Sequence, residues 1–258
     1  MIKNKIDIIE ESFYNTDLLD NEYMKQQKEE YLDHRNNDFP INPYRNYLKI
    51  LKYFKEINQY NPSHAASFAK RIKTEWKDWR NCEAVISEMI VYHNYIPLIR
   101  ERLVKSLSLE TDECDVIVEH SDGSKYYLEI FCIIPNFQEY EDGVINIQTH
   151  TQKAFSSVRQ KLLRKANKQR QFLTERENFA VIELNDRRIA RDFTLLSSLS
   201  DGYKIKIDME EMTNFDEGYD WESSVFQFPE TRFLKGIIWF HLGNYQDRKI
   251  LINERFKQ

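Results

Sequence analysis

The 258-residue chain has few residues that break or cross-link a polypeptide: six glycines, six prolines and three cysteines. So few helix breakers predict that helices dominate and that loops are limited. The cysteines, Cys82, Cys114 and Cys132, form no CxxC pair and no cluster with metal-ligand spacing. Because an odd count favours reduced thiols, we expect a cytoplasmic protein rather than a disulfide-bonded secreted one.

Long hydrophobic runs and familiar catalytic signatures are also missing. No run approaches transmembrane length, and the N-terminus lacks a positive-then-apolar signal pattern, so we expect no membrane partner. There is no P-loop, GxGxxG, GxSxG or HExxH motif, which leaves the chemistries that these motifs mark with little support. His93, His120 and His241 carry no ligand spacing, and His241 is expected to be a core or strand-edge residue.

The charge balance is mildly acidic, with a formal net charge of −5. It gives no global signature of nucleic-acid binding, so any basic surface must be local. The hydrophobic fraction of 41% supports a real core, enough for one large domain or for a compact domain with an appendage.

The first part of the chain is predicted to be helical. Residues 1–40 are charged with scattered aromatics, which indicates a peripheral helical arm or a partly disordered segment. Asn61-Pro62 is typical of a helix N-terminus, and Trp76 and Trp79 are expected in the core. Helices are predicted at 43–60, from 62 onward and at 81–94, followed by an extended segment at 96–109. We divide the chain into a helical N-terminal region, 1–80, and an α/β domain, 81–258.

A predicted hairpin, Cys114 to Cys132, organises the second part. Two apolar strands flank a turn that contains Ser121-Asp122-Gly123. A two-residue loop would place Asp115 and Glu129 on opposite faces. A three-residue loop with left-handed Gly123 would place them opposite each other, and we favour it because Gly123 stands where that turn needs a positive φ.

The remaining elements complete an α/β pattern. A long helix with basic solvent faces is predicted at 151–174, after a loop at 135–150, and the segment 208–222 is expected to be an acidic surface loop. Strands are predicted at 179–184, 203–207, 236–241 and 249–253, with a short helix at 193–199. Because the hairpin is antiparallel while the long helix can act as a crossover, we expect a mixed sheet.

Three acids could carry metal chemistry: Glu88 on a predicted helix, Asp115 at the start of a strand and Glu129 inside the next. Mg²⁺ takes oxygen ligands and usually keeps several waters beside one or two carboxylates. Such an ion can polarise a phosphoryl oxygen and generate a hydroxide nucleophile. Each acid also has an ordinary explanation, as a strand cap, a solvent-facing strand residue or a salt-bridge partner, and Glu83 competes with Glu88.

The order and spacing of these acids resemble the PD-(D/E)XK nuclease superfamily, over about residues 81 to 185. The resemblance implies a restriction-endonuclease-like αβββαβ core and a Mg²⁺- or Mn²⁺-dependent hydrolysis of DNA phosphodiester bonds. Asp115 and Glu129 would bind the metal together with the Ile130 carbonyl, and Glu88 would act through a metal-bound water or a second metal.

The sequence departs from the family at one position. The Glu-x-Lys motif is Glu129-Ile130-Phe131 here, so the lysine is missing. At about 100° per residue, Gln169 falls within the apolar stripe of the long helix and Lys165 on its margin, whereas Lys161 and Lys168 point further out. The resemblance implies that Lys165 replaces the lysine and that Gln169 contacts substrate or a metal-bound water.

The basic helix would also contact nucleic acid, through Arg159, Lys161, Arg164 and Lys168. The alternative is an ordinary solvated helix face. Two other functions stay open: a catalytically inactive relative that binds nucleic acid or a protein partner, and an interaction protein assembled through residues 1–80. DNA is the expected partner, with RNA as an alternative, and a homodimer is a further option.

Overall fold

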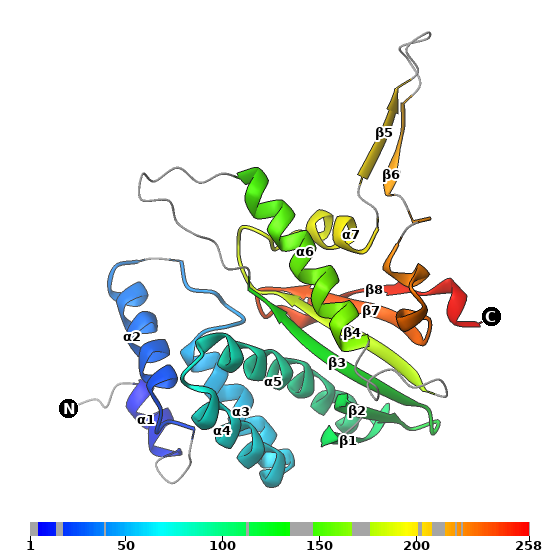
Figure 1. Cartoon of the computed structure of the whole chain (residues 1–258). Helices are drawn as coiled ribbons and strands as arrows, with labels where there is room; N and C mark the ends of the chain where they lie inside the picture. The colour runs from blue at the N-terminus through cyan, green and yellow to red at the C-terminus, as the bar shows by residue number, and fades with distance from the viewer. Residues whose placement is uncertain are drawn as a thin grey trace. The chain divides into compact units, whose positions relative to one another are not determined.

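The computed structural model describes residues 5–13, 18–38, 40–111, 114–134, 147–166, 176–200, 203–207, 215–219, 221–222 and 224–257. It has an α/β fold that divides into two compact units (Figure 1). Unit 1 consists of Met1–Thr111, Asp115–Lys125 and Leu242–Arg248. Unit 2 consists of Asp112–Cys114, Tyr126–His241 and Lys249–Gln258.

Unit 1 is built mainly from helices. They are α1 (Lys5–Glu11), α2 (Glu22–Asn36), α3 (Tyr47–Tyr60), α4 (Pro62–Glu75) and α5 (Trp79–Arg100). Four of them begin at a side-chain cap that accepts a hydrogen bond from a backbone N–H of the first turn: Asn21, Asn46, Asn61 and Asp78. The predicted Asn61-Pro62 helix start is confirmed, with proline in the first turn where its missing N–H costs nothing.

The segment 1–40 contributes to the core of unit 1. Leu18, Tyr23 and Met24 are buried, and α2 packs against α3. Helices α3, α4 and α5 pack against one another around Phe54 and Phe68. The helical arm predicted for this segment is therefore present in α1 and α2, and part of it is buried.

Two predictions for the end of this helical region are wrong. Trp76 and Trp79 are 47% and 48% exposed, because α4 ends at Glu75 and the chain leaves the packed face of that helix. The segment expected to be extended from residue 96 instead continues α5 to Arg100, with Pro97 in its last turn. The strand β1 (Val104–Thr111) begins only afterwards.

The C-terminus of α5 has the hydrogen bonds of a Schellman motif. The N–H of Leu103 donates to the Leu98 carbonyl at 2.9 Å, and that of Arg102 to the Ile99 carbonyl at 3.0 Å. Arg102 has φ 62°, a left-handed conformation that glycine usually supplies at this position. This cap reverses the chain into β1.

The predicted turn after β2 (Cys114–His120) is confirmed. The N–H of His120 donates to the Ser124 carbonyl at 2.8 Å, and the N–H of Gly123 to the His120 carbonyl at 3.0 Å. Gly123 has φ 89°, as a three-residue loop with a G1 bulge requires. The turn leads into β3 (Lys125–Ile133), so both predicted hairpin strands are present.

Unit 2 contains a mixed sheet with the strand order β3-β4-β7-β8. β3 runs parallel to β4 (Glu177–Leu184), and β4 runs parallel to β7 (Leu234–His241). β7 pairs antiparallel with β8 (Lys249–Ile252). The helices α6 (Ile147–Ala166) and α7 (Asp192–Leu199) lie over one face (Figure 1). Phe131, Ile182 and Trp239 point to this face and form a core with Val158 and Leu162 of α6.

The other predicted elements of unit 2 are mostly confirmed. The strands β4, β7 and β8 and the helix α7 stand where expected. α6 starts four residues earlier than predicted, and the expected continuation to residue 174 lies outside the described residues. β5 (Tyr203–Ile207) pairs antiparallel with β6 (Phe215–Tyr219), so the acidic segment expected to be a loop contains a strand. No helix in the described ranges is long and apolar enough to cross a membrane.

Candidate functional site

The candidate site in unit 2 centres on one buried carboxylate. Glu129 lies in the middle of β3 and is 1% exposed. Because alternate strand residues share a face, it points to the same side as Phe131, whose side chain is in the core beneath α6. A buried carboxylate in such surroundings costs several kcal/mol unless charged or polar groups bind it.

A lysine from α6 binds this carboxylate. The Nζ of Lys165 donates a hydrogen bond to the Oε1 of Glu129, forming an ion pair. The same Nζ lies 5.5 Å from the ring centroid of Phe131, close enough for a cation–π interaction. The structure therefore brings together the carboxylate and the lysine that the resemblance paired, with the lysine provided by the helix rather than by the strand.

The other basic residues of α6 have different environments. The Nζ of Lys161 donates to the Cys132 carbonyl at 2.9 Å. Arg159 donates to the Ser200 carbonyl at 3.5 Å and lies over the Phe228 ring at 5.2 Å. Arg164 is exposed. Lys168 and Gln169, predicted to extend this surface and the site, lie outside the described residues.

In unit 1, the two candidate glutamates of α5 are both bound to arginine. Glu88 accepts hydrogen bonds from both terminal nitrogens of Arg71 on α4, one of them at 2.7 Å. Glu83 accepts from the Nε of Arg45 at 2.8 Å and from the hydroxyl of Tyr23 at 2.6 Å. Burial, and then the Glu83 charge, raises the pKa of the Tyr23 hydroxyl well above its usual value. Glu83 therefore joins three segments of unit 1 in a buried network.

Asp115, the remaining predicted metal ligand, is half-buried in β2 of unit 1. Within the residues that the structure describes, no group of three or more His, Cys, Asp or Glu side chains is arranged to hold a metal ion. The described residues therefore contain no site in which protein side chains alone would surround a metal ion. An ion that keeps most of its waters needs only one or two carboxylates.

Sequence reasoning missed a set of cations that stack on aromatic rings where the parallel strands of unit 2 begin. Arg176 lies 4.8 Å from the ring centroid of Tyr127, and Lys235 lies 5.3 Å from that of Tyr126. Arg232 lies 4.3 Å from the Phe233 ring centroid, just before β7. In the sequence, this set could have been found from a basic residue close to an aromatic residue at the start of each strand.

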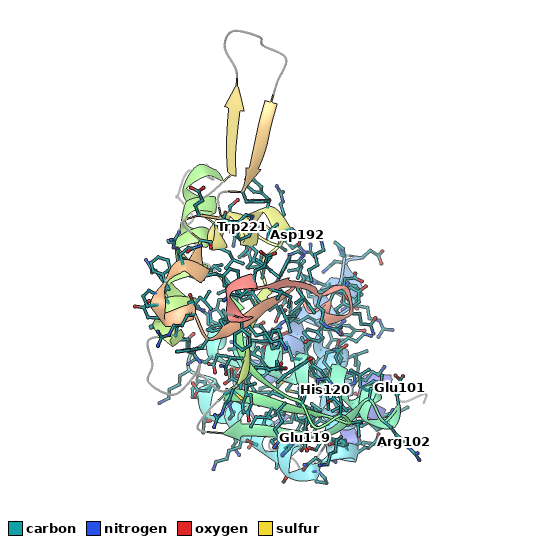
Figure 2. The ribbon with its side chains drawn as sticks, turned by 90° about the vertical axis from the view of Figure 1, so that its right-hand side faces the viewer. Glu101, Arg102, Glu119, His120, Asp192 and Trp221 are labelled. Carbon is teal, nitrogen blue, oxygen red and sulfur yellow. The ribbon has the colours of Figure 1, made fainter. Side chains whose placement is uncertain are left out.

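A second missed cluster lies at the other end of β7. Asp192, the first residue of α7, accepts a hydrogen bond from the Trp239 indole at 2.8 Å and is bound by Lys249. The Nε2 of His241 lies 3.6 Å from the Asp192 carboxylate. Burial and, more weakly, Lys249 lower the pKa of His241, although Asp192 opposes the shift. Figure 2 labels Asp192, below the β5–β6 hairpin.

Comparison of the chain with family models, with curated proteins and with solved structures found no match.

Proposed function

We propose that the protein is a Mg²⁺- or Mn²⁺-dependent nuclease that hydrolyses DNA, with Glu129 and Lys165 in its active site. The observation that carries the proposal is the ion pair between these two residues on the face of β3 under α6. The element order along the chain, α5-β1-β2-β3-α6-β4, is also the αβββαβ order that the resemblance implies. A lysine contributed by the helix would replace the one missing at Phe131.

The donor set fits a metal that retains most of its water. Glu129 supplies one carboxylate, and the three-residue turn at Gly123 is the condition under which Asp115 would stand opposite it. The pairing of Asp115 with Glu129 stays a prediction, as does the binding of Glu88 to a metal-bound water. A bound Mg²⁺ would polarise the scissile phosphate and lower the pKa of a coordinated water.

The residues of the chain would position the reactants. The Phe131 ring and the Glu129 carboxylate hold the Lys165 ammonium, and the Lys165 side chain is 22% exposed. Three donor hydrogens let an ammonium bind a carboxylate and also reach a water or a phosphate oxygen. Lys165 would thus orient the attacking water and offset the negative charge that develops on the phosphate.

Nucleic acid would lie across the cations of α6 and those at the edge where the parallel strands of unit 2 begin. Arg164 and Arg232 are exposed, and Arg176 and Lys235 are half-buried against aromatic rings. Guanidinium and ammonium groups neutralise phosphates, and aromatic rings at the same edge can stack on unpaired bases. Because the chain has a net charge of −5, a surface that binds nucleic acid must be local, and these cations would form one.

The decisive experiment is a cleavage assay with and without Mg²⁺ or Mn²⁺ on plasmid, single-stranded and branched DNA. We expect metal-dependent cleavage that Glu129→Gln and Lys165→Met each reduce by at least about a hundredfold, as loss of a general acid–base or charge-stabilising group does. Glu119→Gln is the matched control, because this carboxylate is bound to Lys105 in unit 1. Intact DNA in every condition, or equal rates for Glu129→Gln and wild type, would refute the proposal.

A second candidate is a nucleic-acid-binding protein of the same fold without catalysis. It is favoured by the ion pairs themselves, because Arg71 binds Glu88 and Lys165 binds Glu129. Calorimetry separates the two functions. Mn²⁺ binding that Glu129→Gln abolishes supports the nuclease, whereas DNA binding with no Mn²⁺ binding supports the second candidate.

A further inference from the structure

A pocket of about 290 Å³ lies in unit 2, between the 3₁₀ turn η1 (Val225–Gln227) and β8. The segments before η1 and after β8 complete its wall. Its lining residues are Trp221, Ser224, Phe226, Gln227, Leu251, Ile252, Asn253 and Glu254. None of them belongs to the candidate nuclease site.

Hydrogen bonds fix the polar parts of this wall. The Trp221 carbonyl accepts from the backbone N–H of Ser224 at 3.2 Å and from the Nε2 of Gln227 at 3.4 Å. On the other side, the Nδ2 of Asn253 donates to the Leu234 carbonyl at 2.9 Å, which ties the end of β8 to β7. Trp221 and Leu251 also pack against the core under α6. The pocket is therefore formed before any ligand arrives.

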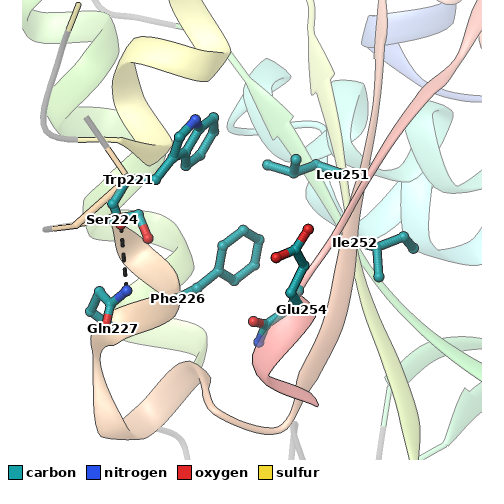
Figure 3. Close-up of a pocket in the computed structure, with 8 residues that line it drawn as sticks. Trp221, Ser224, Phe226, Gln227, Leu251, Ile252 and Glu254 are labelled. Atoms are coloured by element: carbon teal, nitrogen blue, oxygen red, sulfur yellow. Dashed lines mark hydrogen bonds between the residues drawn. The ribbon is translucent and has the colours of Figure 1, made fainter. Parts of the chain in front are cut away.

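The chemistry of the lining is aromatic and aliphatic, with one charge. Figure 3 shows the rings of Trp221 and Phe226 on one side, Leu251 on the other, and the Glu254 carboxylate in the space between them, whereas the Ile252 side chain points away. Within the described part of the chain, Glu254 has no ion-pair or hydrogen-bond partner. A carboxylate without a partner beside two aromatic rings produces a negative potential, since the ring faces are also negative.

We propose that this pocket binds a small organic cation, a substituted ammonium with an apolar body. The ammonium would face Glu254 and the aromatic rings, and the apolar part would contact Leu251 and Phe226. An anion would be repelled by the carboxylate. A hard metal ion would find a single carboxylate among mainly apolar walls, whereas it prefers several oxygen ligands. The proposal is independent of the nuclease function.

Titration calorimetry of the full chain with choline and with its neutral isostere 3,3-dimethylbutan-1-ol tests the role of charge. We expect choline to bind about tenfold more tightly than the alcohol, as a cation–π contact of ordinary strength gives. Glu254→Gln should weaken choline binding about tenfold and leave the alcohol unaffected. Trp221→Leu should weaken both ligands, because it removes a wall of the pocket.

Glu222→Gln is the matched control, because this exposed acid is adjacent to Trp221 in sequence but does not line the pocket. It should bind choline like the wild type. The proposal is overturned if choline gives no binding heat, if both ligands bind equally well, or if Glu254→Gln and Glu222→Gln have the same affinity for choline. Far-ultraviolet circular dichroism of each variant shows that it is folded.

Discussion

Lys165 of α6 binds Glu129 of β3 through an ion pair in which the carboxylate is almost fully buried. The pair connects the crossover helix to the strand that it covers, beside an apolar core formed by Phe131, Val158 and Leu162. The ion pair stabilises the fold independently of any catalytic role, because a buried charge that loses its partner lowers the stability of the folded protein. The two roles can be measured separately.

Lys165→Met should destabilise unit 2 by about 3 kcal/mol, the lower end of the cost of removing one partner from a buried pair. The methionine keeps most of the side-chain volume, so the decrease in unfolding free energy measures the effect of removing the charge. Urea unfolding followed by fluorescence measures it, and Arg164→Met, an exposed neighbour on α6, is the control. In the double variant Lys165→Met with Glu129→Leu we expect much of the stability to return, because no buried charge is left behind. A double variant less stable than either single one would contradict this explanation.

Arg71→Met should destabilise unit 1 by about 2 kcal/mol, because Glu88 loses two charge-assisted hydrogen bonds in a buried setting. The Arg71 side chain is 29% exposed, so water can partly replace it. Thermal and urea unfolding would measure the change, and the exposed neighbour Lys70→Met should have almost no effect. Equal stability of the two variants would mean that the Arg71–Glu88 pair contributes nothing.

Two substitutions at left-handed positions should have opposite effects. Arg102→Gly should stabilise the protein by about 1 kcal/mol, because Arg102 has φ 62° in the cap of α5 and glycine adopts this conformation without strain. The backbone carbonyl of Arg102, which accepts a bond from the Ser121 hydroxyl, is retained.

Gly123→Ala should destabilise by about 1 kcal/mol, through φ 89° alone, since an added Cβ meets nothing within 4 Å. Unfolding midpoints of the two variants and of wild type decide both predictions. The same sign of change in both variants would contradict them.

Stability should fall as the solution is acidified from about pH 7.5 to about pH 5.5, the range in which an unfolded histidine takes up its proton. Burial lowers the pKa of His241 and of His93 in the folded protein, and Glu56 only partly opposes the shift at His93. The unfolded chain therefore binds more protons than the folded one in this range.

His241→Gln should make the dependence of the unfolding free energy on pH less steep, and urea unfolding at several pH values would show it. Asp192 should not contribute in this range. Burial alone would raise its pKa, but the hydrogen bonds from Lys249 and Trp239 lower it below its usual value, so Asp192 stays ionised throughout this range. An unchanged slope for His241→Gln would show that His241 does not titrate differently in the folded state.

The sequence alone determined the elements whose signals are local. Asn61-Pro62 starts a helix because an amide cap and an N–H-free first residue satisfy helix geometry without outside help. The turn at Gly123 follows from the need for a positive φ at one position. The periodicity of the helix placed Lys165 on the margin of its apolar stripe, next to the sheet that the stripe covers. Its contact with Glu129 was implied by the resemblance rather than by the periodicity.

Tertiary structure decided what depends on where elements end and on what packs beside them. Trp76 continues the helical spacing of α4 but is exposed because the helix stops one residue earlier. Pro97 looks like a strand start, yet it fits the last turn of α5. The arginine partner of Glu88 comes from another helix, and Glu254 and Phe226 line one pocket because β8 pairs with β7. Such contacts join residues distant in sequence, and local propensity carries no information about them.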